Sequence, residues 1–121
     1  MMETILVVED TKYFSDILTD ELKDSHYNVI TVYNGASALK KIEEKMPDLI
    51  ILDVKLPDIT GTEILAYVRQ YDTKVPVIIC TAIPSPKLKT YYDRWASAVI
   101  IKPVDLDSLL GIVKKELAKV K

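Results

Sequence analysis

The sequence has little cysteine, histidine or glycine, and it has no hydrophobic run long enough to cross a membrane. Its 121 residues include one Cys, one His and three Gly. Cys80 has no disulfide partner within the chain, and its place in an apolar strand predicts a buried, unreactive thiol. A membrane-spanning helix needs about 20 apolar residues, and no basic leader precedes an apolar core, so we expect neither insertion nor secretion. These absences favour a cytoplasmic location.

The charged residues lack a strong excess of one sign. Sixteen Lys and Arg stand against 18 Asp and Glu, which gives a net charge of −2. Such a chain has no basic bias that would attract nucleic acid, so we expect no direct nucleic-acid contact. With 121 residues, 49% of them hydrophobic, the chain can bury one core without a structural metal. A single domain over residues 1–121 is therefore expected.

Short runs of Val, Ile and Leu alternate with longer amphipathic stretches. They predict strands near 4–8, 28–32, 49–52, 77–80 and 99–101, and helices near 13–23, 35–45, 61–71, 86–95 and 106–119. Continuous apolar strands separated by helices are typical of a parallel sheet that is covered on both faces. We therefore predict an α/β fold: a doubly wound five-stranded parallel sheet of order 2-1-3-4-5, a flavodoxin-like (βα)5 three-layer sandwich.

Polar side chains follow four of the predicted strands at the point where each strand ends. Glu9 and Asp10 follow the first strand, and Asp53 follows the third. Thr81 follows the fourth strand and Lys102 the fifth. The predicted order places the first and third strands side by side, and right-handed crossovers bring all carboxyl ends to one edge. The sequence thus predicts an acidic pocket flanked by a hydroxyl and an ammonium group.

Three carboxylates and one lysine leave this pocket with excess negative charge. Crowded carboxylates have raised pKa values unless a cation neutralises them. Oxygen ligands without Cys or His favour Mg²⁺, or Mn²⁺, over zinc, and the lone His26 lies before the second strand. A metal beside a carboxylate nucleophile is also what phosphoryl transfer requires, which makes Asp53 the candidate nucleophile. Lys102 and Thr81 can then contact the added phosphoryl oxygens.

Several motifs in order along essentially the whole chain resemble those of receiver domains of two-component response regulators. They are Val7-Val8-Glu9-Asp10, Asp53 with Pro57 and Gly61, Thr81-Ala82, and Lys102-Pro103. The resemblance implies that Asp53 accepts a phosphoryl group from a sensor histidine kinase or a phosphotransfer protein. It implies a set of Mg²⁺ ligands: Glu9, Asp10, Asp53 and the backbone carbonyl of Lys55. It further implies that Thr81, Ala82 and Lys102 hold phosphate oxygens and that the Lys102-Pro103 bond is cis.

The resemblance also implies what the module does. It predicts a signalling protein that catalyses its own phosphorylation and slow autodephosphorylation, not an enzyme that turns over a substrate. Phosphorylation would switch an output face around the fourth and fifth strands. The expected partners are the kinase and a downstream protein, or an output domain of its own if the chain is a fragment. No membrane partner is expected, and a phosphorylation-dependent homodimer is left open.

The sequence departs from the family pattern at several positions. Val99 stands where most members carry a Tyr or Phe that moves on activation, and Trp95-Ala96 replaces the common Gly-Ala after the fourth helix. Lys55 and Ile83 offer no carboxylate or amide to orient water, which predicts slow loss of phosphate. On the fourth helix, spacing separates Tyr92 from the face of Tyr91 and Trp95, so Tyr92 is the predicted exposed aromatic; Tyr13 is expected to be half-buried.

Three other functions fit parts of the same pattern. A phosphate-independent docking module is favoured only by Val99 and the altered Trp95 region. A haloacid dehalogenase enzyme would need a second Asp two residues after the nucleophile, where this chain has Lys55. A flavodoxin-like cofactor site would need a Gly-, Ser- and Thr-containing phosphate cradle after the first strand, where Glu9 and Asp10 would instead repel phosphate.

Overall fold

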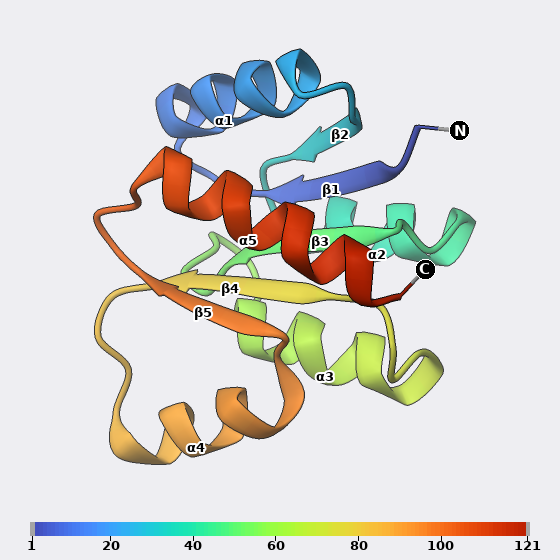
Figure 1. Ribbon diagram of the computed structural model, residues 1–121. Coiled ribbons are helices and arrows are strands. Elements are labelled where there is room, and N and C mark those ends of the chain that lie inside the picture. The colour runs from blue at the N-terminus through green and yellow to red at the C-terminus, as the bar shows by residue number, and fades with distance from the viewer. Residues whose placement is uncertain (1, 121) are drawn as a thin grey trace.

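The computed structural model describes residues 2–120 as alternating strands and helices (Figure 1). The strands are β1 Thr4–Val8, β2 Asn28–Val32, β3 Leu49–Asp53, β4 Val77–Thr81 and β5 Ala98–Ile101. The helices are α1 Lys12–Asp24, α2 Gly35–Glu44, α3 Gly61–Tyr71, α4 Pro86–Trp95 and α5 Leu106–Lys119. Each predicted element is present, with ends that differ by a single residue where they differ. Asp53 and Thr81 close their strands instead of following them.

The strands form one parallel sheet in the predicted order β2-β1-β3-β4-β5. β1 pairs with both β2 and β3, and Val8 lies opposite Leu52 in the register with β3. Asp53 lies opposite Cys80 in the pairing of β3 with β4. Because every strand runs the same way, the residues that follow β1, β3, β4 and β5 meet at one edge of the sheet (Figure 1).

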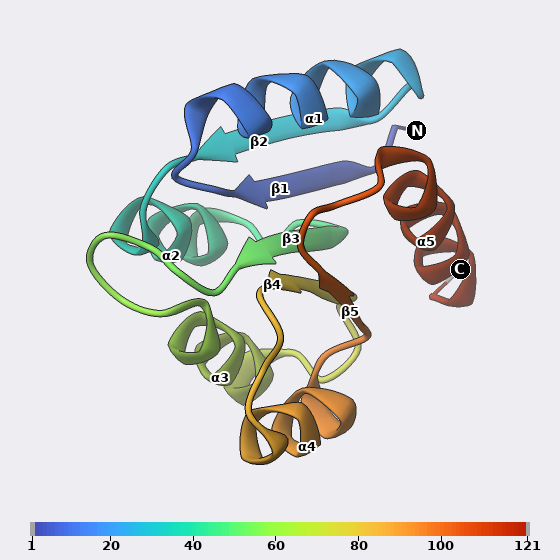
Figure 2. The same ribbon diagram turned by 90° about the vertical axis from the view of Figure 1, so that its left-hand side faces the viewer.

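Helices cover both faces of the sheet, which explains why the strands are apolar on both sides (Figure 2). On one face, buried residues of α1 and α5 pack on alternate strand residues; they include Leu18, Leu109, Val113 and the buried thiol of Cys80. On the other face, α2, α3 and α4 form a second core with the remaining strand residues. Burial raises the pKa of Cys80 to about 12, as expected for an unreactive thiol.

Side-chain caps begin three of the helices and fix the loops before them. Asn34, Thr60 and Ser85 each accept a hydrogen bond from the backbone N–H of the third residue after them, at the starts of α2, α3 and α4. Asp58, in the loop after β3, also accepts hydrogen bonds from Gly35 N–H and Ala36 N–H, both at 2.8 Å. These bonds hold the β3–α3 loop against the first turn of α2.

The fourth helix ends without a glycine. The carbonyl of its last residue is bound by the side chain of Arg69 on α3. Ala96 takes an extended conformation, and its N–H donates to the carbonyl of Tyr92. The free carbonyl of Trp95 accepts a hydrogen bond from Arg69 Nε at 2.8 Å. The same guanidinium donates to the carbonyls of Asp72 and Val75, both in the α3–β4 loop, so one α3 side chain binds three carbonyls in two segments of the chain.

Two of the aromatic predictions are wrong. Tyr92 is buried, with 1% of its surface exposed, and its hydroxyl is hydrogen-bonded to that of Thr62 at 2.7 Å. Trp95, by contrast, is 37% exposed. Tyr13 is 78% exposed instead of half-buried, because the buried stripe of α1 runs through Ser15, Leu18 and Leu22. Among residues 2–120, no helix combines the length and apolar character that crossing a membrane requires.

Candidate functional site

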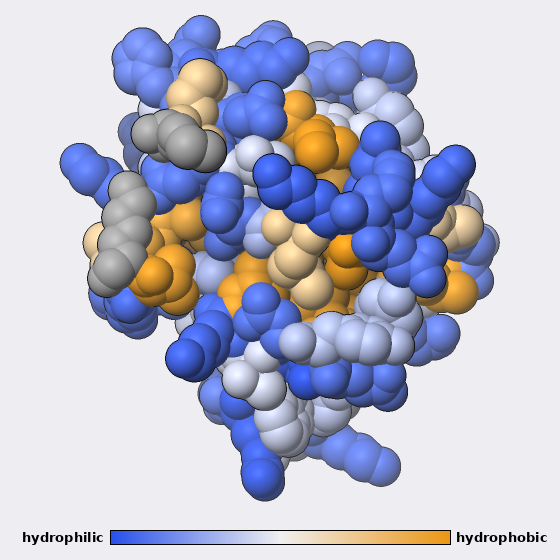
Figure 3. Space-filling view, turned by 90° about the vertical axis from the view of Figure 1, so that its right-hand side faces the viewer, coloured by the Kyte–Doolittle hydropathy of each residue, from blue (hydrophilic) through white to orange (hydrophobic). Residues whose placement is uncertain are grey.

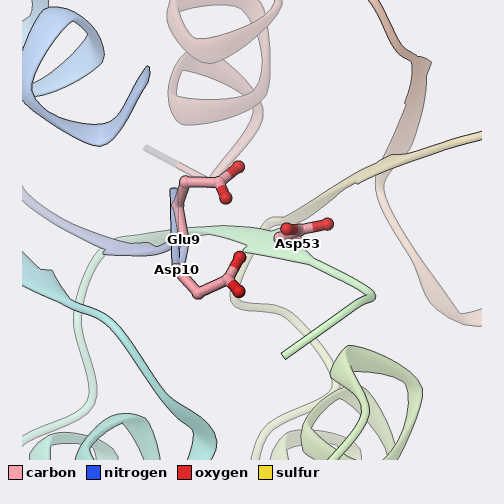
Figure 4. Close-up of side chains that lie close together, drawn as sticks. All are labelled: Glu9, Asp10 and Asp53. Carbon is pink, nitrogen blue, oxygen red and sulfur yellow. The ribbon is translucent and has the colours of Figure 1, made fainter. Parts of the chain in front are cut away.

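The acidic side chains predicted from the strand ends lie together at the carboxyl edge of the sheet. Glu9 and Asp10 directly follow β1, and Asp53 is the last residue of β3. Carboxylate oxygens of the three all lie within 4.8 Å of one another, and Figure 4 shows the Glu9 and Asp10 side chains extending toward Asp53. Glu9 is 3% and Asp53 5% exposed, whereas Asp10 faces solvent.

Lys102 brings the predicted positive charge to this cluster from the end of β5. Its Nζ lies 3.2 Å from Asp53 Oδ1 and 3.4 Å from Glu9 Oε1. Its backbone N–H donates to the carbonyl of Thr81 at 2.8 Å, which fixes the lysine beside β4. The Lys102-Pro103 bond that follows is cis, as the resemblance implied.

The pKa directions at the site reflect burial and mutual charge. Burial raises the pKa of Glu9, the Thr11 N–H that donates to Oε2 at 3.0 Å opposes this, and the charge of Asp53 raises it further. For Lys102, burial alone lowers the pKa, but the charges of Asp53 and Glu9 outweigh burial and raise it. Lys102 therefore stays an ammonium ion at neutral pH. Its single positive charge only partly offsets the mutual repulsion of the three carboxylates, and a bound cation would offset more of it.

The residues predicted to contact phosphate border the same cluster. Thr81 closes β4 and is buried, with 9% exposed, and Ala82 is the exposed residue after it. Lys55 N–H donates to Asp53 Oδ1 at 3.3 Å, so the backbone after the strand already orients the aspartate. His26, by contrast, precedes β2 and so lies at the other edge of the sheet.

Gly61 matters to the site because α3 begins directly against the backbone of Asp53. Its N–H donates to the carbonyl of Val54 at 2.8 Å. A Cβ placed on Gly61 would lie 2.3 Å from the Asp53 carbonyl oxygen and 2.9 Å from Val54 Cα. Only glycine allows this close approach, which gives a physical reason for Gly61 in the Asp53 motif.

The donor set fits a hard divalent cation. The cluster offers carboxylate oxygens only, two of its members are buried, and oxygen ligands of this kind suit Mg²⁺. Among the described residues it is the one group of three potential metal-ligating side chains.

The opposite edge of the sheet shows hydrophilic side chains around separate apolar patches (Figure 3). The chemistry of the fold is thus concentrated at the strands' carboxyl ends.

Sequence reasoning did not find the residues that support this edge from a distance. Asp58 ties the β3–α3 loop to α2, and Thr62 and Arg69 tie α3 to α4. Each acts through a contact with a residue far away in the chain, and no local spacing predicts such contacts. Only the pairing of Thr60 with Glu63 carries a local signal, that of a helix cap.

The fold is a doubly wound sheet whose carboxyl edge carries a cluster of three carboxylates and a lysine. The family model for the response regulator receiver domain matches residues 5–114. The chain therefore belongs to this family, the receiver domains of two-component response regulators, and it is a signalling domain of that class.

Individual relatives agree with this assignment. The response regulator ArlR of Staphylococcus aureus is 39% identical over 98% of this chain and 54% of its own length. This chain thus spans about half the length of that curated relative. A CheY-like response regulator receiver domain protein from Methanospirillum hungatei is 29% identical with a TM-score of 0.92, over 98% of this chain and 96% of that one. Response regulator TrrA from Thermotoga maritima, solved in complex with Mg²⁺-BeF, is 33% identical with a TM-score of 0.83, over 95% and 99% of the two chains.

Proposed function

We propose that this chain is a phosphoacceptor module in which Asp53 receives a phosphoryl group from the phosphohistidine of a sensor histidine kinase or a phosphotransfer protein. The observation that carries the proposal is the position of Asp53. It is a buried carboxylate at a strand end, within 4.8 Å of two more carboxylates and 3.2 Å from Lys102 Nζ. No other cluster among residues 2–120 combines a nucleophile, its neutralising cation and a metal-ligand set.

A divalent cation is part of this proposal. Mg²⁺ would be held by Glu9, Asp10, Asp53 and the backbone carbonyl of Lys55. When bound, it supplies positive charge that offsets the carboxylates and the charge of the transferring phosphoryl oxygens. TrrA, solved with Mg²⁺-BeF, lends support from a relative that is 33% identical.

The chain's own residues position and stabilise the transferred group. A carboxylate oxygen of Asp53 forms the new bond to phosphorus as the bond from phosphorus to the histidine nitrogen breaks, and the nitrogen keeps that electron pair. Lys102, kept charged by Asp53 and Glu9, then pairs with a phosphoryl oxygen. The Thr81 hydroxyl and the Ala82 N–H donate to the others.

Phosphorylation changes the charge at Asp53 from about −1 to about −2. The β4–α4 loop, which begins with Ala82 directly after Thr81, is the segment that would respond, and α4 and β5 would respond with it.

Slow autodephosphorylation belongs to the same proposal. Ile83 is 85% exposed and apolar, and Lys55 is exposed and cationic, so neither can orient an attacking water as a base would. An unchanged phosphoryl half-life in Ile83→Glu and Lys55→Asn would contradict this.

The wider assignment is also proposed. The domain extends over residues 1–121, resides in the cytoplasm, and signals to a downstream protein or to an output domain elsewhere in a longer protein. The length of the ArlR relative, of which this chain covers 54%, favours the second form. Association of two phosphorylated copies is a further outcome to measure by light scattering.

Intact-protein mass tests the proposed function. The protein is incubated with acetyl phosphate and Mg²⁺, beside Asp53→Asn and beside the wild type with a chelator. We expect the mass of one phosphoryl group in the wild type and none in either control. No gain by folded wild-type protein that still binds Mg²⁺ would overturn the proposal and favour a docking module that works without phosphate.

A further inference from the structure

Tyr92 lies buried on α4, and its hydroxyl joins α4 to the first turn of α3. The hydroxyls of Tyr92 and Thr62 are 2.7 Å apart and hydrogen-bonded. Tyr92 is the one described residue of α4 that is fully buried, with 1% of its surface exposed. A buried hydroxyl without a hydrogen-bond partner costs free energy, so the Tyr92 hydroxyl favours the position in which it is bonded to Thr62.

Thr62 follows the residue that contacts the phosphoacceptor backbone. Gly61 N–H donates to the Val54 carbonyl at 2.8 Å, and a Cβ at Gly61 would meet the Asp53 carbonyl oxygen at 2.3 Å. The first turn of α3 is therefore packed directly against the backbone of Asp53 and Val54. A shift of this backbone must move Gly61, and with it Thr62.

The other end of α3 also holds α4. Arg69 lies about two helical turns after Thr62, on the same face of α3, and its Nε donates to the Trp95 carbonyl at 2.8 Å. Two side chains of α3 thus bind α4, one at the buried Tyr92 and one at its last residue. Figure 2 shows α3 and α4 as neighbouring helices on the same face of the sheet.

α4 also lies close to β5, and its contacts there are apolar. A hollow of about 490 Å³ borders this contact, lined by residues that include Tyr92, Ala96 and Val99. Val99 is short and apolar, so β5 offers α4 no side-chain hydrogen bond at this position. The firm polar ties of α4 among the described residues run to α3.

We propose that α4 senses the state of Asp53 through α3, by the path Asp53 backbone, Gly61, Thr62 and Tyr92, in place of a moving aromatic on β5. This inference rests on the proposed function, since it names the route by which phosphorylation reaches the output face. Tyr92 is a positioning residue in it and touches no phosphate. A displaced Thr62 either carries Tyr92 with it or breaks the bond, and α4 shifts or loosens in both cases.

Hydrogen exchange over residues 86–95 tests the route, with and without acetyl phosphate and Mg²⁺, in wild type, Tyr92→Phe, Thr62→Val and the double variant. Tyr91→Phe is the control, because it removes a neighbouring hydroxyl for which the described residues provide no hydrogen-bond partner. Intact mass is read on the same samples. We expect every variant to gain the phosphoryl group as the wild type does.

The expected signature is a loss of coupling without loss of phosphorylation. In unphosphorylated protein, Tyr92→Phe and Thr62→Val each speed α4 exchange about five-fold, the typical effect of one hydrogen bond. The double variant adds nothing further, because both hydroxyls act through one bond. The phosphorylation-dependent change in α4 exchange falls to less than half of the wild-type change in each, and Tyr91→Phe keeps it.

A full wild-type response in Tyr92→Phe would overturn the route, as would additive effects of the two single changes. Failure of the proposed function looks different, because the wild type would then gain no phosphoryl mass. In that case the bond between Tyr92 and Thr62 is tested by α4 exchange in the unphosphorylated wild type, single variants and double variant. A double variant whose effect is no larger than that of either single variant supports the bond, and additive effects overturn it.

Discussion

Replacing Gly61 by Ala tests how tightly α3 is packed on the phosphoacceptor. The added Cβ would lie 2.3 Å from the Asp53 carbonyl oxygen and 2.9 Å from Val54 Cα, whereas ordinary contacts begin at 3.4 Å. Both contacted atoms belong to the backbone, so no side-chain rotation can relieve the clash. The β3–α3 loop must shift by roughly an ångström, and overpacking of this kind costs about 1–3 kcal/mol.

Gly111→Ala is the matched control, with the opposite expected sign. Gly111 lies exposed within α5, and a Cβ there would have no neighbour within 4 Å. Removing a helix-interior glycine should raise the free energy of unfolding by about 0.5–1 kcal/mol. The two alanine variants should therefore differ by about 1.5–4 kcal/mol in urea unfolding.

The same variants separate packing from function. Because Asp53 moves with its backbone, Gly61→Ala should slow phosphoryl uptake from acetyl phosphate by about ten- to a hundred-fold, the effect of misplacing a reacting group by an ångström. Gly111→Ala should take up phosphate at the wild-type rate. A Gly61→Ala protein with wild-type stability and uptake would refute the close packing of α3 on Asp53.

Three further predictions concern stability. Asp58→Asn should lower the free energy of unfolding at pH 7, because backbone N–H groups, first that of Gly35, lower the pKa of Asp58 below its ordinary value of 3.8. That contribution is present above the unfolded pKa and is lost as pH falls through the lower folded pKa, so the gap between wild type and variant in urea unfolding should shrink as pH falls below 3.8; a gap that stays constant with falling pH would contradict this. Ser15→Ala should raise the free energy of unfolding by up to about 1 kcal/mol, because the buried Ser15 Oγ has no hydrogen-bond partner among the described residues, and a loss of stability would show that it has one. Arg69→Gln should lower it by about 2–3 kcal/mol, because three backbone carbonyls, two in the α3–β4 loop and one at the end of α4, lose their donor; a urea midpoint equal to that of the wild type would disprove this role.

The fold and the acid cluster could be predicted because strand ends in a parallel sheet share one edge. The apolar runs before Glu9 and Asp53 indicate two buried strands, and the doubly wound order makes those strands neighbours. Lys102 is predictable by the same rule, since it follows the last strand. No side-chain contact is needed for this inference, only strand direction and order.

Tyr92 shows where this reasoning fails. Helical spacing separates Tyr92 from Tyr91 and Trp95 but does not say which face meets the sheet. α4 is mostly exposed, and Tyr92 is its one buried side chain among the described residues. The hydroxyl of Tyr92 is hydrogen-bonded to Thr62 on another helix, and spacing within α4 gives no sign of that partner. Arg69 was missed for the same reason, because its partners are backbone carbonyls that carry no sequence signal.

The most direct test of the central claim is to locate the phosphoryl group within the chain. Protein treated with acetyl phosphate and Mg²⁺ is reduced with borohydride, which converts an aspartyl phosphate to homoserine, and is then digested and sequenced by mass spectrometry. We predict homoserine at position 53 alone, and none when the chelator is present. Homoserine at Asp10 or another aspartate, or no homoserine at all, in protein that has gained phosphoryl mass, would contradict the assignment of Asp53 as the phosphoacceptor.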